Sequence, residues 1–350
     1  MSNTIKDVAL AAGVSVATVS RVMNGHSNVS AATRARIEAV MKELRYTPHG
    51  AAQSLVTRRT QTIGVLLPDM HGEFFSELIR GIDVAARIQG LHLLLSSSHG
   101  DLSDTTAALK AMRGRVDGLL IMSPTATASF YAEHLPESLP AVLINAAPGG
   151  TAHARVRIDN YGGAVKMVRH LHRSGRRRLA FIAGPHDNSD AAERLRGFRE
   201  TMRELAPDDA PLIIRGDFNE QSGIRAGQQI AALAERPDAV FAANDMMAIG
   251  CMFALADAGV RVPEDIAVVG YDDIPTARFV RPALTTVSVP IADLGTVALE
   301  RLVGAMEGSE QVRGGETLLR TEVQVRSSCG AARTGSRHLR LLDSGGEAGA

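Results

Sequence analysis

The sequence is poor in several features, and each scarcity excludes a class of protein. It has no tryptophan, 4% aromatic residues and two cysteines in 350 residues. Cys251 and Cys329 are too far apart for a metal-binding or redox spacing, and a disulfide framework is not expected. No apolar run is long enough to cross a membrane, and the N-terminus lacks the apolar core of a signal peptide. We therefore expect a cytoplasmic protein that does not contact the membrane.

The charge is balanced overall but unevenly placed. A formal net charge of zero argues by itself against nucleic-acid binding. Residues 1–60, however, hold eight Lys and Arg against three Asp and Glu, a net charge of +5, which leaves about −5 for the remainder. A basic segment on a mildly acidic body suits phosphate contacts at one end only. With 45% hydrophobic and 22% charged residues, the chain is an ordinary globular protein with room for two or three domains.

Local signals predict three short helices in the first 48 residues. Thr4 with Asp7 can cap the first helix, and Ser15 and Ser30 can cap the other two, while Gly13 suits a turn that needs a positive φ. Three helices with a polar outer helix are the helix-turn-helix layout that reads the DNA major groove, although a plain helical hairpin fits the pattern about equally well. The residues expected to share the inner faces are Val8, Ala9, Ala12, Val19, Val22, Met23, Ile37, Val40, Met41 and Leu44.

From residue 61 onward, short apolar runs alternate with helix-like stretches. Buried apolar strands that alternate with helices indicate parallel sheets covered on both faces. The span 61–330 is long for one open sheet, so we predict an α/β core of two doubly wound parallel-sheet lobes. The chain is expected to cross between them at 159–161, at 287–291 and near 318–322. The runs are 63–67, 91–95, 118–122, 141–144, 179–183, 212–214, 239–242 and 266–269.

Polar and aromatic side chains follow the carboxyl ends of most of these strands, which is where ligands bind in open α/β sheets. Carboxylates and amides bond to vicinal hydroxyls, Arg donates in a fork and rings stack on a pyranose, so a sugar site is predicted. Each acid or amide is equally a good helix cap, Asp245 most of all, and Phe74 and Phe75 equally suit the core. The candidates are Asp69, Phe74, Phe75, Ser123, Asn145, Asn188, Asp190, Arg194, Phe218, Asn244 and Asp272.

The same residues resemble a known family. Ile5-Lys6-Asp7-Val8-Ala9, Ala12-Gly13-Val14-Ser15 and Ala17-Thr18-Val19-Ser20-Arg21-Val22-Met23-Asn24 are similar to the N-terminus of the LacI/GalR family of transcription regulators. Further along, Pro68-Asp69, Gly184-Pro185, Ala243-Asn244-Asp245 and Gly270-Tyr271-Asp272-Asp273 resemble its periplasmic-binding-like core, and the likeness runs to about residue 328.

The resemblance implies a domain plan. Residues 1–48 correspond to a helix-turn-helix head, 49–60 to a hinge helix that forms on operator DNA, and 61–330 to the two-lobed core. Its N-lobe is expected over about 61–158 and 290–320, and its C-lobe over about 159–289 and 321–330. The Gly-rich segment 331–350 is expected to be a disordered tail, without the sustained heptads of a tetramerising coil.

The resemblance also implies which residues contact DNA. Val16, Ala17 and Arg21 take the base-reading positions, and Arg21 is able to bind guanine bidentately, although it also suits a solvated surface. Leu55 takes the position of a hinge leucine that wedges into the minor groove; the alternative is a plain linker whose leucine packs on the core. The other expected DNA-binding residues, mostly polar groups suited to phosphates, are Ile5, Ser15, Thr18, Ser20, Asn24, Ser30, Thr33, Tyr46, His49 and Ala52.

For the core, the family counterparts of Arg194, Asn244 and Asp272 contact the effector, and Phe218 stands where an aromatic wall is found. Asn145 stands where some members use Asp, so the identity of the ligand stays open. We expect a homodimeric transcriptional repressor that binds a pseudo-palindromic operator in double-stranded DNA and is controlled by a small sugar bound between the lobes.

Three alternatives remain. One is a purine- or nucleoside-responsive co-repressor, since Asp272 suits a ribose as well as a hexose. Another is a solute-binding protein without DNA function, against which the missing signal peptide and the basic head argue. The third is an enzyme, but no Gly-rich phosphate loop follows the first strand and no catalytic or metal-binding spacing stands out, so no enzyme, cofactor or metal is expected.

Overall fold

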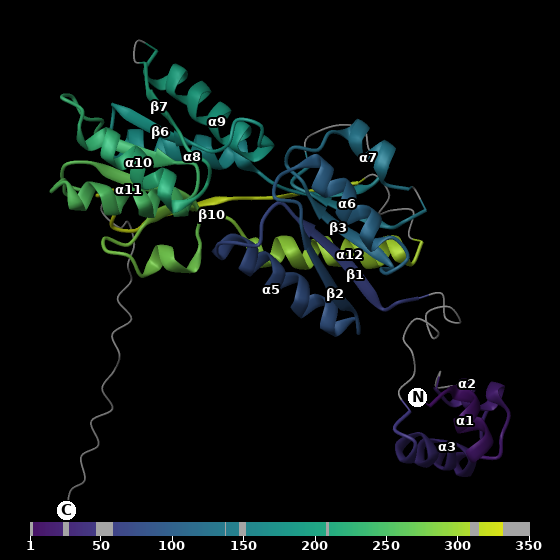
Figure 1. The fold of residues 1–350 in the computed structure, drawn as a ribbon. Coiled ribbons are helices and arrows are strands. Elements are labelled where there is room, and N and C mark those ends of the chain that lie inside the picture. The colour runs from purple at the N-terminus through teal and green to yellow at the C-terminus, as the bar shows by residue number, and fades with distance from the viewer. Residues whose placement is uncertain are drawn as a thin grey trace, which may run out of the picture. The chain divides into compact units, whose positions relative to one another are not determined.

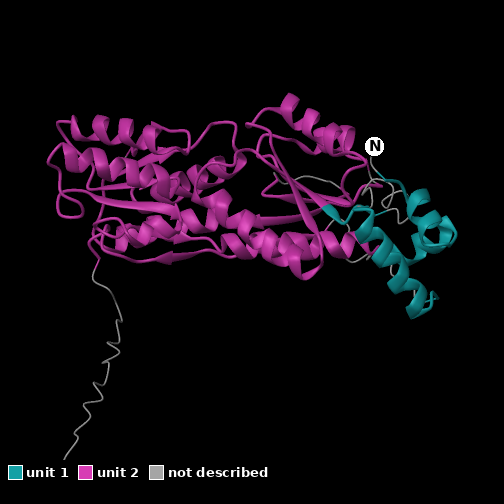
Figure 2. Ribbon diagram, turned by 60° about the horizontal axis from the view of Figure 1, so that its bottom comes forward, with its two compact units in different colours: residues 1–62 teal, residues 63–350 magenta. Residues whose placement is uncertain are grey.

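The computed structural model of the chain describes residues 3–23, 28–46, 59–136, 138–146, 152–207, 210–308 and 315–331. The chain divides into two compact units, residues 1–62 and 63–350 (Figure 2). Within the described ranges, no helix combines the length and the apolar character needed to cross a bilayer. The end of the predicted head (47–48), most of the predicted hinge (49–58 of 49–60) and the tail from 332 onward lie outside the described residues.

The first unit contains the three predicted helices, α1 (Ile5–Ala11), α2 (Val16–Met23) and α3 (Ala31–Glu43). Asp7 accepts 2.8 Å hydrogen bonds from the backbone N–H and the hydroxyl of Thr4, and Ser15 and Ser30 each accept the N–H of the residue three positions later. Gly13, between α1 and α2, has φ +62°. The predicted caps and turn are therefore confirmed. The fully enclosed core is Val8, Ala9, Ala12, Val19, Val22 and Ile37.

The first sheet of the second unit has the strand order β11-β5-β4-β3-β1-β2, and its strands from β11 to β1 pair in parallel. Every residue of β3 and β4 is buried, because helices cover both faces of the sheet. The strands are β1 (Thr62–Leu67), β2 (His92–Ser97), β3 (Gly118–Met122), β4 (Ala141–Ile144), β5 (Ala154–Ile158) and β11 (Glu316–Leu319), and the helices are α5 (Glu73–Ile88), α6 (Leu102–Met112), α7 (Ala128–His134) and α12 (Ile291–Met306).

Helices α5 and α12 lie side by side in this lobe, although they are distant in sequence (Figure 1). A Cβ added to Gly81 on α5 would fall 2.0 Å from the carbonyl oxygen of Ala292 on α12. Glycine is therefore needed at position 81 for the two backbones to approach this closely.

The second sheet has the order β12-β10-β9-β8-β6-β7, parallel except for the antiparallel pair of β10 and β12. The prediction of two doubly wound lobes is confirmed, with β12 as a short antiparallel addition that was not foreseen. The strands are β6 (Leu179–Ala183), β7 (Leu212–Arg215), β8 (Ala239–Ala242), β9 (Ala267–Asp272), β10 (Thr285–Ser288) and β12 (Glu322–Gln324), and the helices are α8 (Asn160–Arg173), α9 (Ser189–Leu205), α10 (Glu220–Ala231), α11 (Asp245–Asp257) and the 3-10 turn η1 (Pro275–Arg278).

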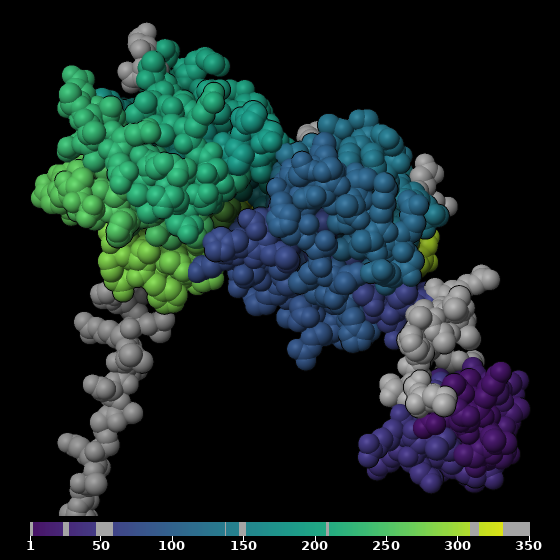
Figure 3. Space-filling model, viewed as in Figure 1, coloured from purple at the N-terminus to yellow at the C-terminus, as the bar shows by residue number. Residues whose placement is uncertain are grey.

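Three segments cross between the lobes at the predicted places, from β5 to α8, from β10 to α12 and from β11 to β12. The hydroxyl of Tyr271 donates to the carbonyl groups of Asp159 and Asn160, which ties the first crossing to β9. The border between the lobes is visible in Figure 3, where the green and teal C-lobe meets the blue N-lobe. Since the strands of both sheets end near this border, the residues that follow them face one another across it.

Candidate functional site

The outer face of α2 carries the residues predicted to read bases. Val19 and Val22 are buried against the rest of the head, and the 3.6-residue period then leaves Val16, Ala17 and Arg21 exposed. The side chain of Val16 is 41% exposed, so its methyl groups are open to contact with a partner. A guanidinium and two small apolar groups on one exposed helical face can meet guanine and a thymine methyl in the major groove.

Of the residues predicted to contact phosphates, some cap helices, some pack against the head core and some lie outside the described residues. Ser15 and Ser30 act as helix caps, and the hydroxyls of Ser15 and Thr18 lie 2.9 Å apart. The backbone N–H of Thr33 donates to the hydroxyl of Ser30, the cap of α3. Ser20 is half-buried on α2. Ile5 and Tyr46 pack, partly buried, against the head core, so the structure gives them a packing role. Four further predicted residues lie outside the described residues, namely Asn24, His49, Ala52 and Leu55.

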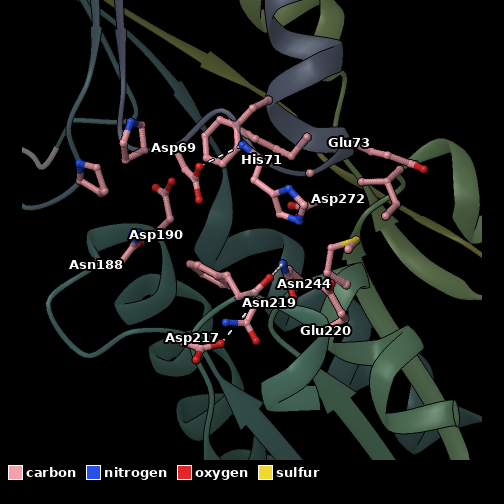
Figure 4. Close-up of a pocket in the computed structure, with 18 of the residues that line it drawn as sticks. Asp69, His71, Glu73, Asn188, Asp190, Asp217, Asn219, Glu220, Asn244 and Asp272 are labelled. Carbon is pink, nitrogen blue, oxygen red and sulfur yellow. Dashed lines mark hydrogen bonds between the residues drawn. The ribbon is translucent and has the colours of Figure 1, made fainter. Parts of the chain in front are cut away.

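In the second unit, a cavity of about 200 Å³ opens between the two lobes (Figure 4). The loop after β1 and the start of α5 form one side, while the loop after β7 and the start of α10 lie opposite. The cavity is thus at the carboxyl ends of the strands, as predicted. The predicted pocket residues that line it are Asp69, Phe74, Phe75, Asn188, Asp190, Arg194, Phe218, Asn244 and Asp272.

Two predicted pocket residues, Ser123 and Asn145, do not line the cavity. Ser123 is 1% exposed, and its carbonyl group accepts a hydrogen bond from Tyr131. Asn145 follows β4 with φ +50°, which turns its amide toward the C-lobe, where Nδ2 donates to Asp190 at 3.0 Å. The strand ends were located correctly, but the direction of the chain after them was not.

The expectation that Asp245 acts as a helix cap was wrong. Asn244 is the N-cap of α11 and accepts the N–H of Met247 at 3.0 Å. Asp245 is fully buried one residue later and accepts the N–H of Ile274 at 3.0 Å and the hydroxyl of Thr286. Burial raises the pKa of Asp245 well above its usual range, and the nearby Asp272 raises it further.

The floor of the cavity is organised around Arg194, which α9 presents with only 3% exposure. Its Nε donates to Asn160 at 2.8 Å and its Nη1 to the carbonyl of Ala243 at 2.6 Å. The guanidinium lies 3.8 Å from the ring centroid of Tyr271 and forms a 3.1 Å ion pair with Asp272. A guanidinium fixed on four sides is a rigid part of the binding wall.

Two buried carboxylates share this one guanidinium. Burial raises the pKa values of Asp190 and Asp272 to about 6, and the positive charge of Arg194 limits both shifts. Asp190 also accepts hydrogen bonds from Asn145 and from Asn160, at 3.0 and 2.8 Å. Oδ1 of Asp272, in contrast, forms only the ion pair, and no described group donates a well-aligned hydrogen bond to it. That oxygen is enclosed by the protein and paired with Arg194 alone among the described residues.

Aromatic rings form the walls. Phe74 and Phe75 pack edge to face with their centroids 5.4 Å apart. Phe218 has φ +70°, and a Cβ added to Gly184 would fall 2.5 Å from its ring, so glycine makes room for that wall. Asp272 has φ +115°. Positive φ at non-glycine residues is costly and gathers at binding sites, where the backbone aims a side chain.

Sequence reasoning missed several lining residues: His71, Glu73, Asp217, Asn219, Glu220, Met246 and Ile274. Asp217, Asn219 and Glu220 follow β7, so the strand-end rule that identified Phe218 would also have found them. Glu73 directly precedes Phe74 after β1 and falls under the same rule. Its partner could not be found this way, because the Glu73 carboxylate spans the lobes to accept the N–H of Thr276 at 2.8 Å, together with the Thr276 hydroxyl.

Comparison with known proteins decides the family. The family described as bacterial regulatory proteins, lacI family, matches residues 4–49, and a periplasmic binding protein-like domain matches residues 168–329. The HTH-type transcriptional repressor PurR of Klebsiella pneumoniae is 37% identical over 321 residues, which cover 88% of this chain and 93% of that protein. The chain belongs to the LacI family.

Further LacI-family proteins agree. The ribose operon repressor of Escherichia coli is 38% identical over 305 residues, covering 86% of this chain and 92% of the repressor. The lac repressor dimer bound to operator and the anti-inducer ONPF aligns with a TM-score of 0.84 and 31% identity, over 94% of this chain and 99% of that one. The chain is therefore a DNA-binding transcriptional regulator with a ligand-binding core, and not an enzyme.

Proposed function

We propose that the chain is a cytoplasmic repressor whose affinity for its operator is set by a small sugar in the cavity between the lobes. The observation that carries the proposal is the presence, on one chain, of a helix-turn-helix head and an interlobe cavity that combines aromatic walls with hydrogen-bond acceptors. Rings that stack on a sugar face and carboxylates that accept its hydroxyls make a suitable sugar site.

In this proposal residues 1–48 bind DNA, and 49–60 form a hinge that orders on the operator. About 61–158 with 290–320, and 159–289 with 321–330, form the two lobes. Two chains form a homodimer, so that their heads contact the two halves of a pseudo-palindrome. Arg21 reads a guanine, Val16 and Ala17 contact bases through apolar groups, and Arg194, Asn244 and Asp272 contact the sugar. A sugar that favours one arrangement of the lobes changes how the two heads are presented.

The test has two parts. An operator is first selected by the full chain from a randomised DNA pool, and its affinity is measured. The melting temperature of the chain is then measured with a panel of sugars, purines and nucleosides. A ligand at a hundred times its dissociation constant adds about 2.7 kcal/mol of stability. Asp272→Asn is expected to abolish the shift while leaving operator binding intact. An unchanged ligand response in that variant would remove Asp272 from the proposed site.

A purine or nucleoside effector is the second candidate, because PurR is among the most similar relatives at 37% identity. The same panel separates the two. Stabilisation by a purine base alone would replace the sugar with a purine and leave the DNA-binding part of the proposal standing.

A further inference from the structure

The charges that surround the interlobe cavity are strongly one-sided. Six carboxylates line it against one guanidinium, that of Arg194, counting the described residues only. Arg194 is already paired with Asp272 at 3.1 Å, and its charge also offsets Asp190. The cavity therefore has an excess of negative charge and no unpaired guanidinium in its described wall. The carboxylates belong to Asp69, Glu73, Asp190, Asp217, Glu220 and Asp272.

We infer that the effector is a single, uncharged sugar ring, and that the site rejects the phosphate ester of the same sugar. This inference rests on the proposed sugar response and adds the charge and the size of the ligand to it. Both limits follow from the described residues of the cavity wall.

The size limit comes from the cavity volume. About 200 Å³ lies below the ~300–1,000 Å³ of pockets that hold drug-sized ligands. Phe74 and Phe75 restrict the N-lobe side, and Phe218 the C-lobe side. One sugar ring between these rings suits the space, whereas a disaccharide would have to open the lobes.

The charge limit comes from where the carboxylates lie. A phosphate ester carries about −1.5 to −2 charges at neutral pH. Bound in the cavity, it would lie close to the buried carboxylates of Asp190 and Asp272 and would face Glu220 at the exposed side. Asp217, also at that side, is paired with Arg225 at 3.4 Å and repels it less. Repulsion at such distances in a protein interior weakens binding by about a hundredfold or more.

The same wall does not demand a cationic ligand. Both oxygens of Asp190 accept amide hydrogens, from Asn145 and Asn160, and Glu73 is bonded to Thr276. Exposed Asp69 accepts the N–H groups of the two residues that follow it. An ammonium group would lose its hydration to reach carboxylates that already have partners. Hydroxyl groups stay neutral and lose less hydration on burial than an ammonium group does.

The experiment measures binding to the full chain by calorimetry with matched sets of ligands. The panel contains common pentoses and hexoses, the phosphate ester and the 2-amino derivative of each where they exist, disaccharides, purine bases and nucleosides. We expect at least one uncharged monosaccharide to bind, and its phosphate ester to bind at least about a hundredfold more weakly.

Each other outcome overturns the inference in a recognisable way. A phosphate ester or an amino sugar that binds as tightly as its parent contradicts the charge limit, and a disaccharide that binds more tightly contradicts the size limit. In these cases the proposed sugar response still stands. Binding of purines or nucleosides alone, or of no sugar at all, overturns the sugar response as well.

A variant checks the electrostatic cause directly. The double substitution Asp69→Asn with Glu220→Gln removes two carboxylates from the exposed side of the cavity and keeps their shapes. The ratio of affinities for the sugar and its phosphate ester should fall at least about fivefold at low salt and less at high salt, because salt screens exposed charges. Glu235→Gln, an exposed acid away from the cavity, is the matched control and should leave the ratio unchanged. An unchanged ratio in the double variant would contradict the charge argument.

Discussion

Replacing Arg194 by methionine should destabilise the core in a pH-dependent manner. Methionine keeps most of the length of the side chain but removes the guanidinium whose charge lowers the pKa values of both Asp190 and Asp272. The carbonyl of Ala243 and the Oδ1 of Asn160 lose their donors at the same time. The substitution therefore leaves Asp272 without its ion-pair partner and Asp190 with the smaller influence of Arg157. It also leaves two buried acceptors without these donors.

The size of the loss follows from these contacts. Breaking a buried ion pair by removing one partner costs about 3–5 kcal/mol. Arg194 lowers the pKa values of both carboxyl groups, so without it their folded-state pKa values rise further above about 6. Protonation then removes the uncompensated charge as the pH falls. We expect the loss at pH 5.5 to be smaller than that at pH 7.5 by about 1–2 kcal/mol, since one pKa unit corresponds to about 1.4 kcal/mol. The lost hydrogen bonds cost the same at both pH values.

The assay is urea unfolding of the full chain at pH 5.5 and 7.5, with the core transition followed by tyrosine fluorescence. Arg196→Met is the matched control, because Arg196 lies on the same helix but is 47% exposed and pairs with Glu193 and Glu200 at the surface. It should cost less than about 1 kcal/mol at either pH. A loss for Arg194→Met that is as small as that of the control, or that is equal at both pH values, would refute the reasoning.

Other substitutions test separate parts of the account. Asp190→Asn should reduce the pH dependence of the unfolding free energy. The folded-state pKa of Asp190 is about 6 against an ordinary 3.8, so this group lowers the stability of the wild type by up to about 1.4 kcal/mol per pH unit as the pH rises through that window. Asp272 keeps its own contribution in the variant, and an unchanged slope would contradict the pKa shift of Asp190. Gly81→Ala should destabilise the N-lobe by about 1–3 kcal/mol in calorimetry, because its Cβ meets Ala292, and a stabilised variant would contradict the close helix packing. Ile37→Ala should cost the head about 2–5 kcal/mol and abolish operator binding while the thermal shift with sugar persists; retained operator binding would count against this core. Arg21→Ala should reduce discrimination between operator and scrambled DNA by about 1–3 kcal/mol in binding assays, and equal discrimination in variant and wild type would remove Arg21 from base reading.

The head could be predicted closely because its determinants are local. Thr4 with Asp7, Ser15 and Ser30 cap helices within three residues of themselves, and Gly13 needs its positive φ whatever the rest of the chain does. The two-sheet core could be predicted equally well, because few folds other than a helix-covered parallel sheet fit continuous apolar strands that alternate with helices.

The sequence predicted those site residues that directly follow a strand, and few others. Arg194 and Asp272 were found, but the direction of the chain after β4 was not, because a positive φ at Asn145 is not encoded in any short pattern. The bond between Glu73 and Thr276 joins residues 203 positions apart, and only the packing of the two lobes brings them together. Helix α11 begins at Asp245, so its cap is Asn244, which also lines the cavity, and Asp245 is buried instead of capping.

The most direct test of the central claim is the linkage between the two sites. Operator affinity of the full chain would be measured by fluorescence anisotropy with and without a saturating amount of the monosaccharide that stabilises it. The account predicts a change of about 5- to 150-fold, and the same factor in sugar affinity when operator is added. Identical operator affinity in both conditions would contradict the account, because the cavity would then have no influence on the head.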